Sequence, residues 1–129
     1  MRWQKNMQLI DANVILRCIL DDCPEMTSKA VEVIDNGAYT KPEIISEVVY
    51  VLQKVYSLQR LQIKIMINNI LDVVSCPEDE CIRMAIDIYS SISLDFVDCL
   101  LIAYHRVNKE NVFSFDKKLN KHLENLKKR

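Results

Sequence analysis

The chain has 129 residues and a net charge of −1, with 50% hydrophobic and 27% charged residues. This length is typical of one domain, and this balance is typical of a globular protein rather than a disordered or membrane-embedded one. Gly37 is the only glycine, which excludes the glycine-rich loops that bind dinucleotides or nucleoside triphosphates. His105 and His122 are the only histidines, and their spacing excludes a His-Glu-x-x-His zinc site.

The cysteines and the absence of long apolar runs predict where the protein resides. Five cysteines are an odd number, and no Cys-x-x-Cys pair occurs, so reduced thiols are expected rather than a disulfide framework. The pairs Cys18/Cys23 and Cys76/Cys81 resemble zinc-ligand spacings only loosely. No apolar run is long enough to span a membrane, and residues 1–6 lack the apolar region of a signal peptide. We therefore expect a cytoplasmic protein.

Short β-type runs alternate with longer helical patterns along the chain. This alternation predicts an α/β fold with a short central parallel sheet of four to five strands flanked by helices. The predicted strands are Gln8–Ile10, Ala38–Thr40, Val73–Ser75 and Val112–Phe113. Between them, apolar residues recur at helical spacings of three and four, as in the series Ile45, Val48, Leu52, Val55 and the series Ile82, Ala85, Ile88 or Tyr89, Ile92.

Helix boundaries are predicted from capping residues, prolines and the glycine. Thr40 and Glu43 have the spacing of a capping box, and Pro42 between them is tolerated in a first helical turn. A helix is therefore expected to begin at about Pro42. Gly37 is expected to end the helix that begins near Thr27 by adopting a left-handed conformation. Cys76-Pro77 is expected to end the third strand and open the next helix.

We expect one domain over residues 1–129, with residues 1–6 as an N-terminal lead and residues 117–129 as a basic C-terminal helix. The last thirteen residues hold six Lys or Arg side chains against one glutamate, a net charge of +5, which leaves −6 on the rest. Such a helix can contact phosphates, although a solvated terminal helix is the more common meaning of this pattern.

Four carboxylates are predicted to meet at one edge of the sheet. Ligands of open parallel α/β sheets bind at the carboxyl ends of the strands, and the connecting helices run antiparallel to the strands. Asp11 follows the first strand, and Glu47 lies in the second turn of the helix after the second strand. Asp98 lies at the start of the helix that leads into the fourth strand, and Asp116 follows that strand.

Carboxylates that lie together repel one another unless a cation compensates their charge or some of them are protonated. A divalent ion is the obvious compensation, and oxygen ligands without His or Cys select Mg²⁺ or Mn²⁺. Such an ion lowers the pKa of a bound water and stabilises the charge that develops on phosphorus. This donor set therefore points to hydrolysis of phosphodiester bonds.

Each acid also has a structural interpretation. Asp11 and Asp116 stand where an N-cap is favoured, although Asn13 adds a second polar group beside Asp11. Asp95 and Asp98 share a helix face, and we expect Asp98 to be the ligand and Asp95 the cap or an outer neighbour. Glu47 lies in an apolar stretch, where an isolated carboxylate needs a partner.

Four segments together resemble the PIN-domain ribonucleases, and in particular VapC-like toxins. The resemblance covers about Met7 to Leu126. It rests on Leu-Ile-Asp-Ala-Asn-Val-Ile-Leu-Arg at residues 9–17, Ile-Ser-Glu-Val-Val-Tyr-Val-Leu at residues 45–52, Asp-Phe-Val-Asp-Cys-Leu-Leu-Ile-Ala at residues 95–103, and Val-Phe-Ser-Phe-Asp at residues 112–116. Two departures are mild: Ala12 and Ser114 stand where the family usually has threonine.

The resemblance implies a metal-dependent endoribonuclease that acts as the toxin of a toxin–antitoxin pair. In this family Asp11, Glu47, Asp98 and Asp116 would hold Mg²⁺ or Mn²⁺, and Asn13 and Ser114 would match polar positions of the pocket. It further implies a structured RNA substrate such as transfer RNA or ribosomal RNA, a homodimer, and inhibition by a cognate antitoxin.

Three other interpretations remain. Asp11-Ala12-Asn13-Val14 is similar to the opening of haloacid-dehalogenase-type phosphatases, but Asn13 stands in place of their second aspartate. A receiver domain needs an aspartate after the third strand, where this chain has Cys76-Pro77-Glu78. The third is a non-catalytic interaction module whose acidic rim binds a basic partner.

Overall fold

The structure, a computed structural model, describes the backbone of residues 7–127 and the side chains of residues 7–123. The predicted N-terminal lead and the last two residues of the predicted basic helix lie outside the described residues. The chain forms two compact units, the first ending at Asp79 and the second beginning at Glu80. Each unit is described by itself.

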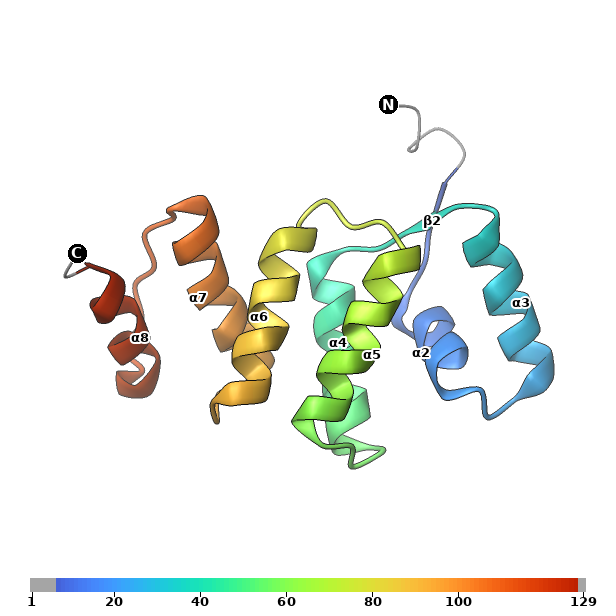
Figure 1. The fold of residues 1–129 in the computed structure, drawn as a ribbon, viewed down its shortest axis with the longest axis horizontal. Helices are drawn as coiled ribbons and strands as arrows, with labels where there is room; N and C mark the ends of the chain where they lie inside the picture. The colour runs from blue at the N-terminus through green and yellow to red at the C-terminus, as the bar shows by residue number, and fades with distance from the viewer. Residues whose placement is uncertain (1–6, 128–129) are drawn as a thin grey trace. The chain divides into compact units, whose positions relative to one another are not determined.

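The first unit is a short parallel sheet with four helices (Figure 1). Its strands pair in parallel, with Gln8 opposite Ala38 and Leu9 opposite Tyr39, and a single parallel bridge joins Tyr39 to Ser75. The helix α2 packs against α3, α4 and α5, and α4 packs against α5. The elements are β1 (Gln8–Leu9), α2 (Ala12–Leu20), α3 (Pro24–Asp35), β2 (Ala38–Tyr39), α4 (Pro42–Lys54) and α5 (Arg60–Val73).

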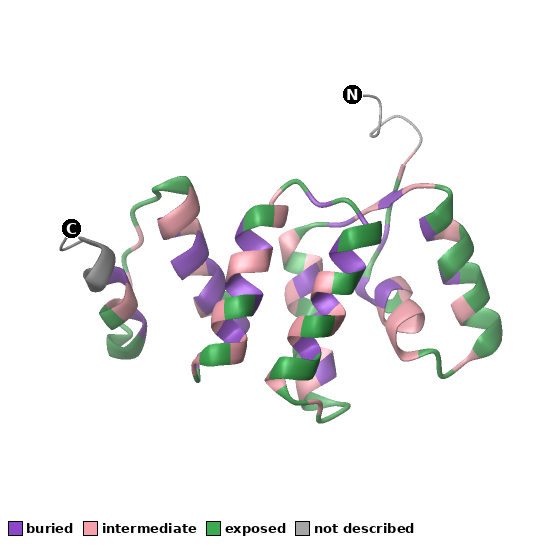
Figure 2. Ribbon diagram, viewed as in Figure 1, coloured by how far each residue is buried: buried purple, intermediate pink, exposed green. Residues whose placement is uncertain are grey.

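Apolar residues at helical spacing form the buried stripe of each of these helices, which Figure 2 shows in purple. Burial of such side chains stabilises the fold by about 1.5–3 kcal/mol each. The predicted series on α4 is confirmed for three of its members, but Val55 is 65% exposed because the helix ends just before it. The buried side chains of α2, α4 and α5 include Ile15, Ile45, Val48, Leu52, Ile63 and Ile67.

In the described part of the second unit, every regular element is a helix, and non-helical segments connect these helices. It contains α6 (Asp79–Ser91), whose first residue closes the first unit, α7 (Phe96–Asn108) and α8 (Lys117–Lys127), and α7 packs against α8. Tyr89 on α6 contacts Phe96 on α7 edge to face, with ring centroids 6.0 Å apart and ring planes at 79°. In the predicted series on α6, Ile82 and Ala85 are fully buried, and of the two residues that the series allowed at its third position, Tyr89 is fully buried and Ile88 only half-buried.

The prediction of four to five strands is wrong for this structure, which shows two strands and one bridge within residues 7–127. Val73 is the last residue of α5, so the predicted third strand is reduced to the bridge at Ser75. Val112–Phe113 is not a strand. A strand needs a neighbour to pair with, and the described part of its unit contains only helices. The parallel α/β class itself is confirmed by β1 and β2.

The predicted start of the helix at Pro42 is confirmed, but its predicted capping box is not. The helix α4 begins at Pro42 as expected, but its N-cap is Lys41, and Thr40 makes no capping bond. The fully buried Thr40 hydroxyl instead donates a hydrogen bond to the Ile10 carbonyl at 3.4 Å. The capping-box prediction is therefore wrong, because Thr40 faces the neighbouring strand.

Of the other predicted boundaries, the one at Gly37 is confirmed, and the starts of two helices differ by a few residues from the prediction. Gly37 has the expected positive φ, 106°, and follows α3. That helix begins at Pro24 rather than near Thr27, because Cys23 supplies an extended N-cap residue. After Cys76-Pro77 the chain makes a turn before α6 begins at Asp79. All five cysteines are free thiols.

The conformation of Gly37 yields a stability prediction. We expect Gly37→Ala to lower the free energy of unfolding by about 1–2 kcal/mol, because residues with a Cβ are strained at positive φ. The added Cβ would lie 3.4 Å from Met7 Cγ, so the cost comes from the backbone rather than from a clash. Urea denaturation measures it, with Asn36→Ala, at an ordinary φ of −83°, as the control. Equal stability of the two variants would contradict the prediction.

Candidate active site

Asp11 lies directly beyond the carboxyl end of β1. Its backbone position is set by the preceding residue, because the Ile10 N–H donates to the Tyr39 carbonyl at 3.0 Å and the Ile10 carbonyl accepts from Thr40. The Asp11 side chain is the N-cap of α2, where Oδ1 accepts a hydrogen bond from the Val14 N–H at 3.1 Å. The structural role that the sequence allowed for Asp11 is thus present, and it occupies one carboxylate oxygen.

Glu47 lies on the exposed face of α4, while Ile45, Val48 and Val49 on the same helix are buried. The expectation that an apolar surrounding forces Glu47 to find a partner is therefore wrong, because its carboxylate faces solvent. Its placement still follows from β2, since α4 begins three residues after that strand ends. The helix that Asp11 caps packs against the helix that carries Glu47.

Asp98 lies in the first turn of α7, near two further carboxylates of the second unit. Burial raises the pKa of its carboxyl group above the ordinary value of 3.8, and the negative charges of Asp116 and Asp95 raise it further. Asp95 is the N-cap residue of α7, but its side chain makes no capping hydrogen bond, so the prediction that it caps the helix is wrong. The three acids therefore form a group of interacting negative charges.

Asp116 is held in place by local hydrogen bonds. Its Oδ1 accepts from the Leu119 N–H at 2.8 Å, the contact of an N-cap at the start of α8. Its N–H donates to the Ser114 hydroxyl oxygen at 3.0 Å, and the Ser114 carbonyl accepts from Asn120 Nδ2 at 2.8 Å. Ser114 thus supports Asp116 directly, and Asn120, which the sequence did not indicate, supports both.

The predicted site residues are divided between the two units. Asp11, Asn13 and Glu47 belong to the first unit, and Asp95, Asp98, Ser114 and Asp116 belong to the second. Asn13 is exposed and borders a groove of about 160 Å³ between α2 and α3. No group of three or more His, Cys, Asp or Glu side chains within residues 7–127 has an arrangement that holds a metal ion.

The side chains of these acids nevertheless have the chemistry that suits a hard divalent cation. Their donor atoms are all carboxylate oxygens, and Asp98, Asp116 and Asp95 repel one another in the absence of a positive charge. Thr40 is a further residue that the structure adds, since its buried hydroxyl helps to fix the strand end that carries Asp11. Its place as the last residue of the predicted strand Ala38–Thr40 was the available signal, but the capping-box pattern favoured a different role.

Comparison with known families identifies the class of protein. The family model of the PIN domain matches residues 9–123, a span that runs through both units, and the chain therefore belongs to the PIN-domain family. PIN domains are generally nucleases. Neither a curated protein nor a solved structure matches the chain.

Within residues 7–127, no helix is both long and apolar enough to cross a bilayer.

The raised pKa of Asp98 generates a prediction with a defined sign. A carboxyl group whose pKa is raised on folding favours the native state most when it is protonated, below its ordinary pKa of 3.8, and this contribution is lost as pH rises through the raised pKa. We therefore expect Asp98→Asn to be more stable than the wild type at pH 7 in EDTA, with a difference that shrinks toward pH 3. Urea denaturation across this range measures it.

The control for this experiment is Glu110→Gln. Its exposed carboxylate accepts from Asn108 Nδ2 at 3.2 Å, and a glutamine can still accept that bond. We expect its stability to follow the wild type at every pH. An Asp98→Asn variant that is less stable than the wild type at pH 7 would show that Asp98 is attracted to a partner rather than repelled by Asp116 and Asp95.

Proposed function

We propose that the protein is an endoribonuclease in which Asp11, Glu47, Asp98 and Asp116 together hold Mg²⁺ or Mn²⁺. The observation that carries this proposal is the PIN-domain match over residues 9–123, because that span includes all four acids. Two further features support it. The donors are all carboxylates, and Asp98 lies among like charges that a cation would neutralise.

In this proposal the chemistry is performed by the divalent ion and by the carboxylates that hold it. A divalent ion bound by these acids would supply an activated water and stabilise the charge that develops on the phosphate. Asp11 and Asp116 would present carboxylates that their capping bonds already orient, since one oxygen of each is tied to a helix N-terminus. Asp95 would lie beside Asp98 without binding the ion. Asn13 and Ser114 would supply further polar side chains around the four acids.

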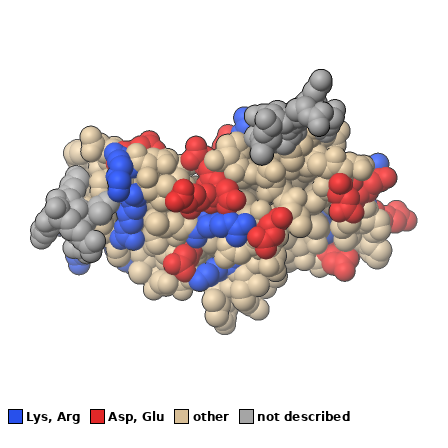
Figure 3. Space-filling view, turned by 45° about the horizontal axis from the view of Figure 1, so that its top comes forward, with Lys and Arg blue, Asp and Glu red and all other residues tan. Residues whose placement is uncertain are grey.

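RNA binding requires positive charge that the molecule as a whole lacks. Figure 3 shows Asp and Glu side chains in separate groups and a stripe of Lys and Arg near the C-terminal end of the described chain. Lys117, Lys118 and Lys121 on α8 are exposed. In this proposal they contact RNA phosphates, and that contact is sensitive to salt because it is screened by ions and releases counterions from the RNA.

The biological part of the proposal rests on the resemblance to VapC-like toxins. By this resemblance, we propose that the protein is the toxin of a toxin–antitoxin pair, forms a homodimer, and is inhibited by a cognate antitoxin protein. Its substrate would be a structured RNA, such as transfer RNA or ribosomal RNA. Shape and stacking rather than the acids would decide the cleavage site.

A cleavage assay tests the enzymatic part. We expect the wild type to cut RNA with Mg²⁺ or Mn²⁺ and to stop in EDTA. Asp98→Asn should lower the rate by at least about 100-fold while the far-ultraviolet circular dichroism is unchanged. Glu110→Gln is the matched control and should cut RNA as the wild type does. Equal rates for the wild type and Asp98→Asn would mean that the cleavage comes from a contaminant.

The capping acids separate an enzyme from a non-catalytic interaction module. Their capping bonds alone would explain Asp11 and Asp116 in a module. Asparagine also caps helices, so Asp11→Asn and Asp116→Asn should keep the fold while each removes one negative charge. An enzyme would lose RNA cleavage in both variants, whereas a module would show no cleavage in any variant and only partner binding.

Growth of a bacterial host tests the toxin part. We expect induced expression of the wild type to arrest growth, and Asp98→Asn at equal protein level to permit it. Optical density after induction and immunoblotting measure the two quantities. Arrest that persists in Asp98→Asn would contradict a toxic nuclease, and RNA cleavage without growth arrest would retain the nuclease and exclude the toxin.

A further inference from the structure

Two phenylalanine side chains project from the segment that connects α7 to α8. Phe113 is 82% exposed and Phe115 is 90% exposed, whereas no other large apolar side chain among residues 7–123 is more than 65% exposed. Aromatic side chains normally stabilise a protein by being buried, and an exposed apolar cluster commonly marks a surface that binds something else. The two rings therefore indicate a binding surface in the second unit.

The arrangement of the two rings leaves flat faces free. They contact each other edge to face, with ring centroids 5.1 Å apart and ring planes at 82°. In such a pair one ring offers its edge and the other offers one face, so the remaining faces are not used by the contact. Because both side chains are exposed, these faces are open to solvent. A flat apolar face that is open suits another flat ring, such as a nucleobase.

Hydrogen bonds around Ser114 hold the segment that carries the rings. The Ser114 carbonyl accepts from Asn120 Nδ2 at 2.8 Å, and the Ser114 hydroxyl oxygen accepts from the Asp116 N–H at 3.0 Å. Phe113 and Phe115 flank Ser114 in the chain, so their backbone is tied to the first turns of α8. A segment that is already held loses less conformational entropy when a ligand stacks on it.

Positive side chains adjoin this segment. Lys117 and Lys121 are exposed, and their spacing of four places both on the same face of α8. Neither forms an ion pair within the described part of the chain. Lys118 instead donates to the Ser93 carbonyl at 2.5 Å. Aromatic rings beside ammonium groups are the combination by which proteins bind the bases and the phosphates of single-stranded nucleic acid.

Both rings are within reach of an RNA chain that is bound at Asp116. Phe115 directly precedes Asp116, and Phe113 is three residues before it. Since a chain spans at most about 3.6 Å per residue, the Cα atoms of Phe113 and Asp116 are at most about 11 Å apart. Asp116 is one of the acids assigned to the divalent ion, so a phosphate held there would bring its neighbouring bases to the rings.

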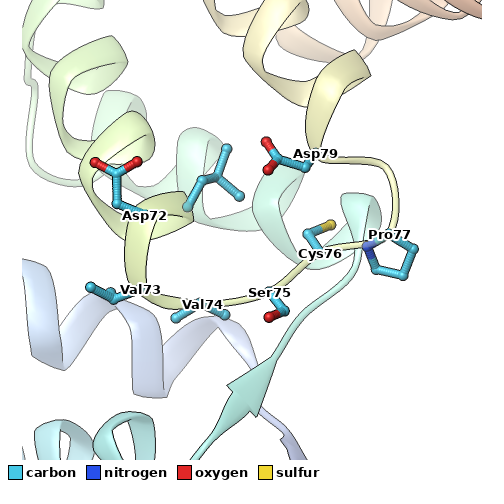
Figure 4. Close-up of a pocket in the computed structure, with 8 residues that line it drawn as sticks. Asp72, Val73, Val74, Ser75, Cys76, Pro77 and Asp79 are labelled. Carbon is cyan, nitrogen blue, oxygen red and sulfur yellow. The ribbon is translucent and has the colours of Figure 1, made fainter. Parts of the chain in front are cut away.

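Other occupants and other surfaces fit less well. A second copy that covered the rings about a twofold axis would bring Lys117 and Lys121 of both copies together, and like charges repel. A cavity of about 410 Å³ in the first unit is lined by residues 71–77 and Asp79, and Figure 4 shows the carboxylates of Asp72 and Asp79 there. No Lys or Arg lines that cavity, so it offers nothing to RNA phosphates.

We propose that Phe113 and Phe115 form a stacking platform for unpaired bases of the RNA substrate, with Lys117 and Lys121 on the adjoining phosphates. The inference rests on the proposed function, which supplies RNA as the ligand. It adds that the RNA is single-stranded where the protein binds it, because the bases of a duplex are stacked on their neighbours and have no free face.

Binding to single-stranded and duplex RNA tests the platform. The protein is the full chain with Asp98→Asn, whose expected loss of cleavage keeps the RNA intact in Mg²⁺. The probes are a fluorescein-labelled RNA of twelve alternating adenosines and cytidines, and the same strand annealed to its complement. Fluorescence anisotropy should show that Phe113→Ala/Phe115→Ala weakens single-strand binding by at least about tenfold and duplex binding by less than about twofold. Single-strand binding that is unchanged, or equal weakening for both probes, would overturn the proposal.

Two control variants in the same Asp98→Asn chain separate the platform from other contributions. Tyr56→Ala removes a 42% exposed ring from the first unit and should leave both affinities unchanged. Lys117→Gln/Lys121→Gln should weaken the binding of both probes, because phosphates are present in each. A loss in Tyr56→Ala as large as that in the double alanine variant would contradict a platform made of Phe113 and Phe115.

Two further variants separate stacking from apolar contact. Phe113→Tyr/Phe115→Tyr keeps two flat rings and should bind the single strand as the parent chain does. Phe113→Leu/Phe115→Leu keeps the apolar character without a ring and should lose binding as the alanine variant does. Leucine variants that bind like the parent chain would overturn stacking as the mode of contact. Nuclear magnetic resonance tests the parent chain itself: saturation with the single strand should shift the ring signals of Phe113 and Phe115, and unmoved signals would overturn the proposal.

Failure of the platform and failure of the nuclease give different results. If the wild type cuts RNA but the alanine substitutions leave single-strand affinity unchanged, the platform is wrong and the nuclease stands. If the wild type does not cut RNA but the chain binds the single strand through both rings, the nuclease is wrong and the platform stands. A dimer that dissociates in Phe113→Ala/Phe115→Ala, with RNA affinity unchanged, would assign the rings to a second copy and overturn the proposal.

Discussion

The parallel pairing of β1, β2 and Ser75 is the constraint on which the rest of the first unit depends. The strands β1 and β2 contribute two residues each and the bridge only Ser75, so few backbone hydrogen bonds set the register. The buried Thr40 hydroxyl adds a bond from β2 to the Ile10 carbonyl, at the last residue before Asp11. A shift by one residue would turn every side chain to the opposite face. The place of Asp11 therefore depends on a pairing that is short but tied at its end.

The same pairing determines what the edge beyond it presents. Because Ser75 turns both backbone groups toward β2, its neighbours must turn theirs outward. Two of those groups are satisfied by α5 and by the turn before α6. The other two belong to Val74 and Cys76, which are only 1% and 9% exposed. The edge of the sheet is therefore covered at these residues rather than open to solvent.

The helices were largely predictable from the sequence, because apolar spacing and proline position act locally. Pro42 marks the start of α4, and the buried face of that helix follows its apolar residues as far as Leu52. The strands were less predictable, because a strand exists only through its partner. Val112–Phe113 has strand-like residues, yet the described part of its unit offers no strand to pair with. Thr40 shows a related difficulty, since both a helix cap and a strand contact suit a threonine at that position.

The sequence proposes the positions of the candidate site, whereas the local bonds of each residue come only from the structure. The structural role that the sequence allowed for Asp11 and Asp116 is present, since each caps a helix through Oδ1. The capping bond fixes the direction of the side chain and uses one of its two carboxylate oxygens. Asp98 has no such bond and lies among like charges, which favour its protonated form. A cation near Asp98 would therefore relieve repulsion there, whereas the capping bonds already orient Asp11 and Asp116.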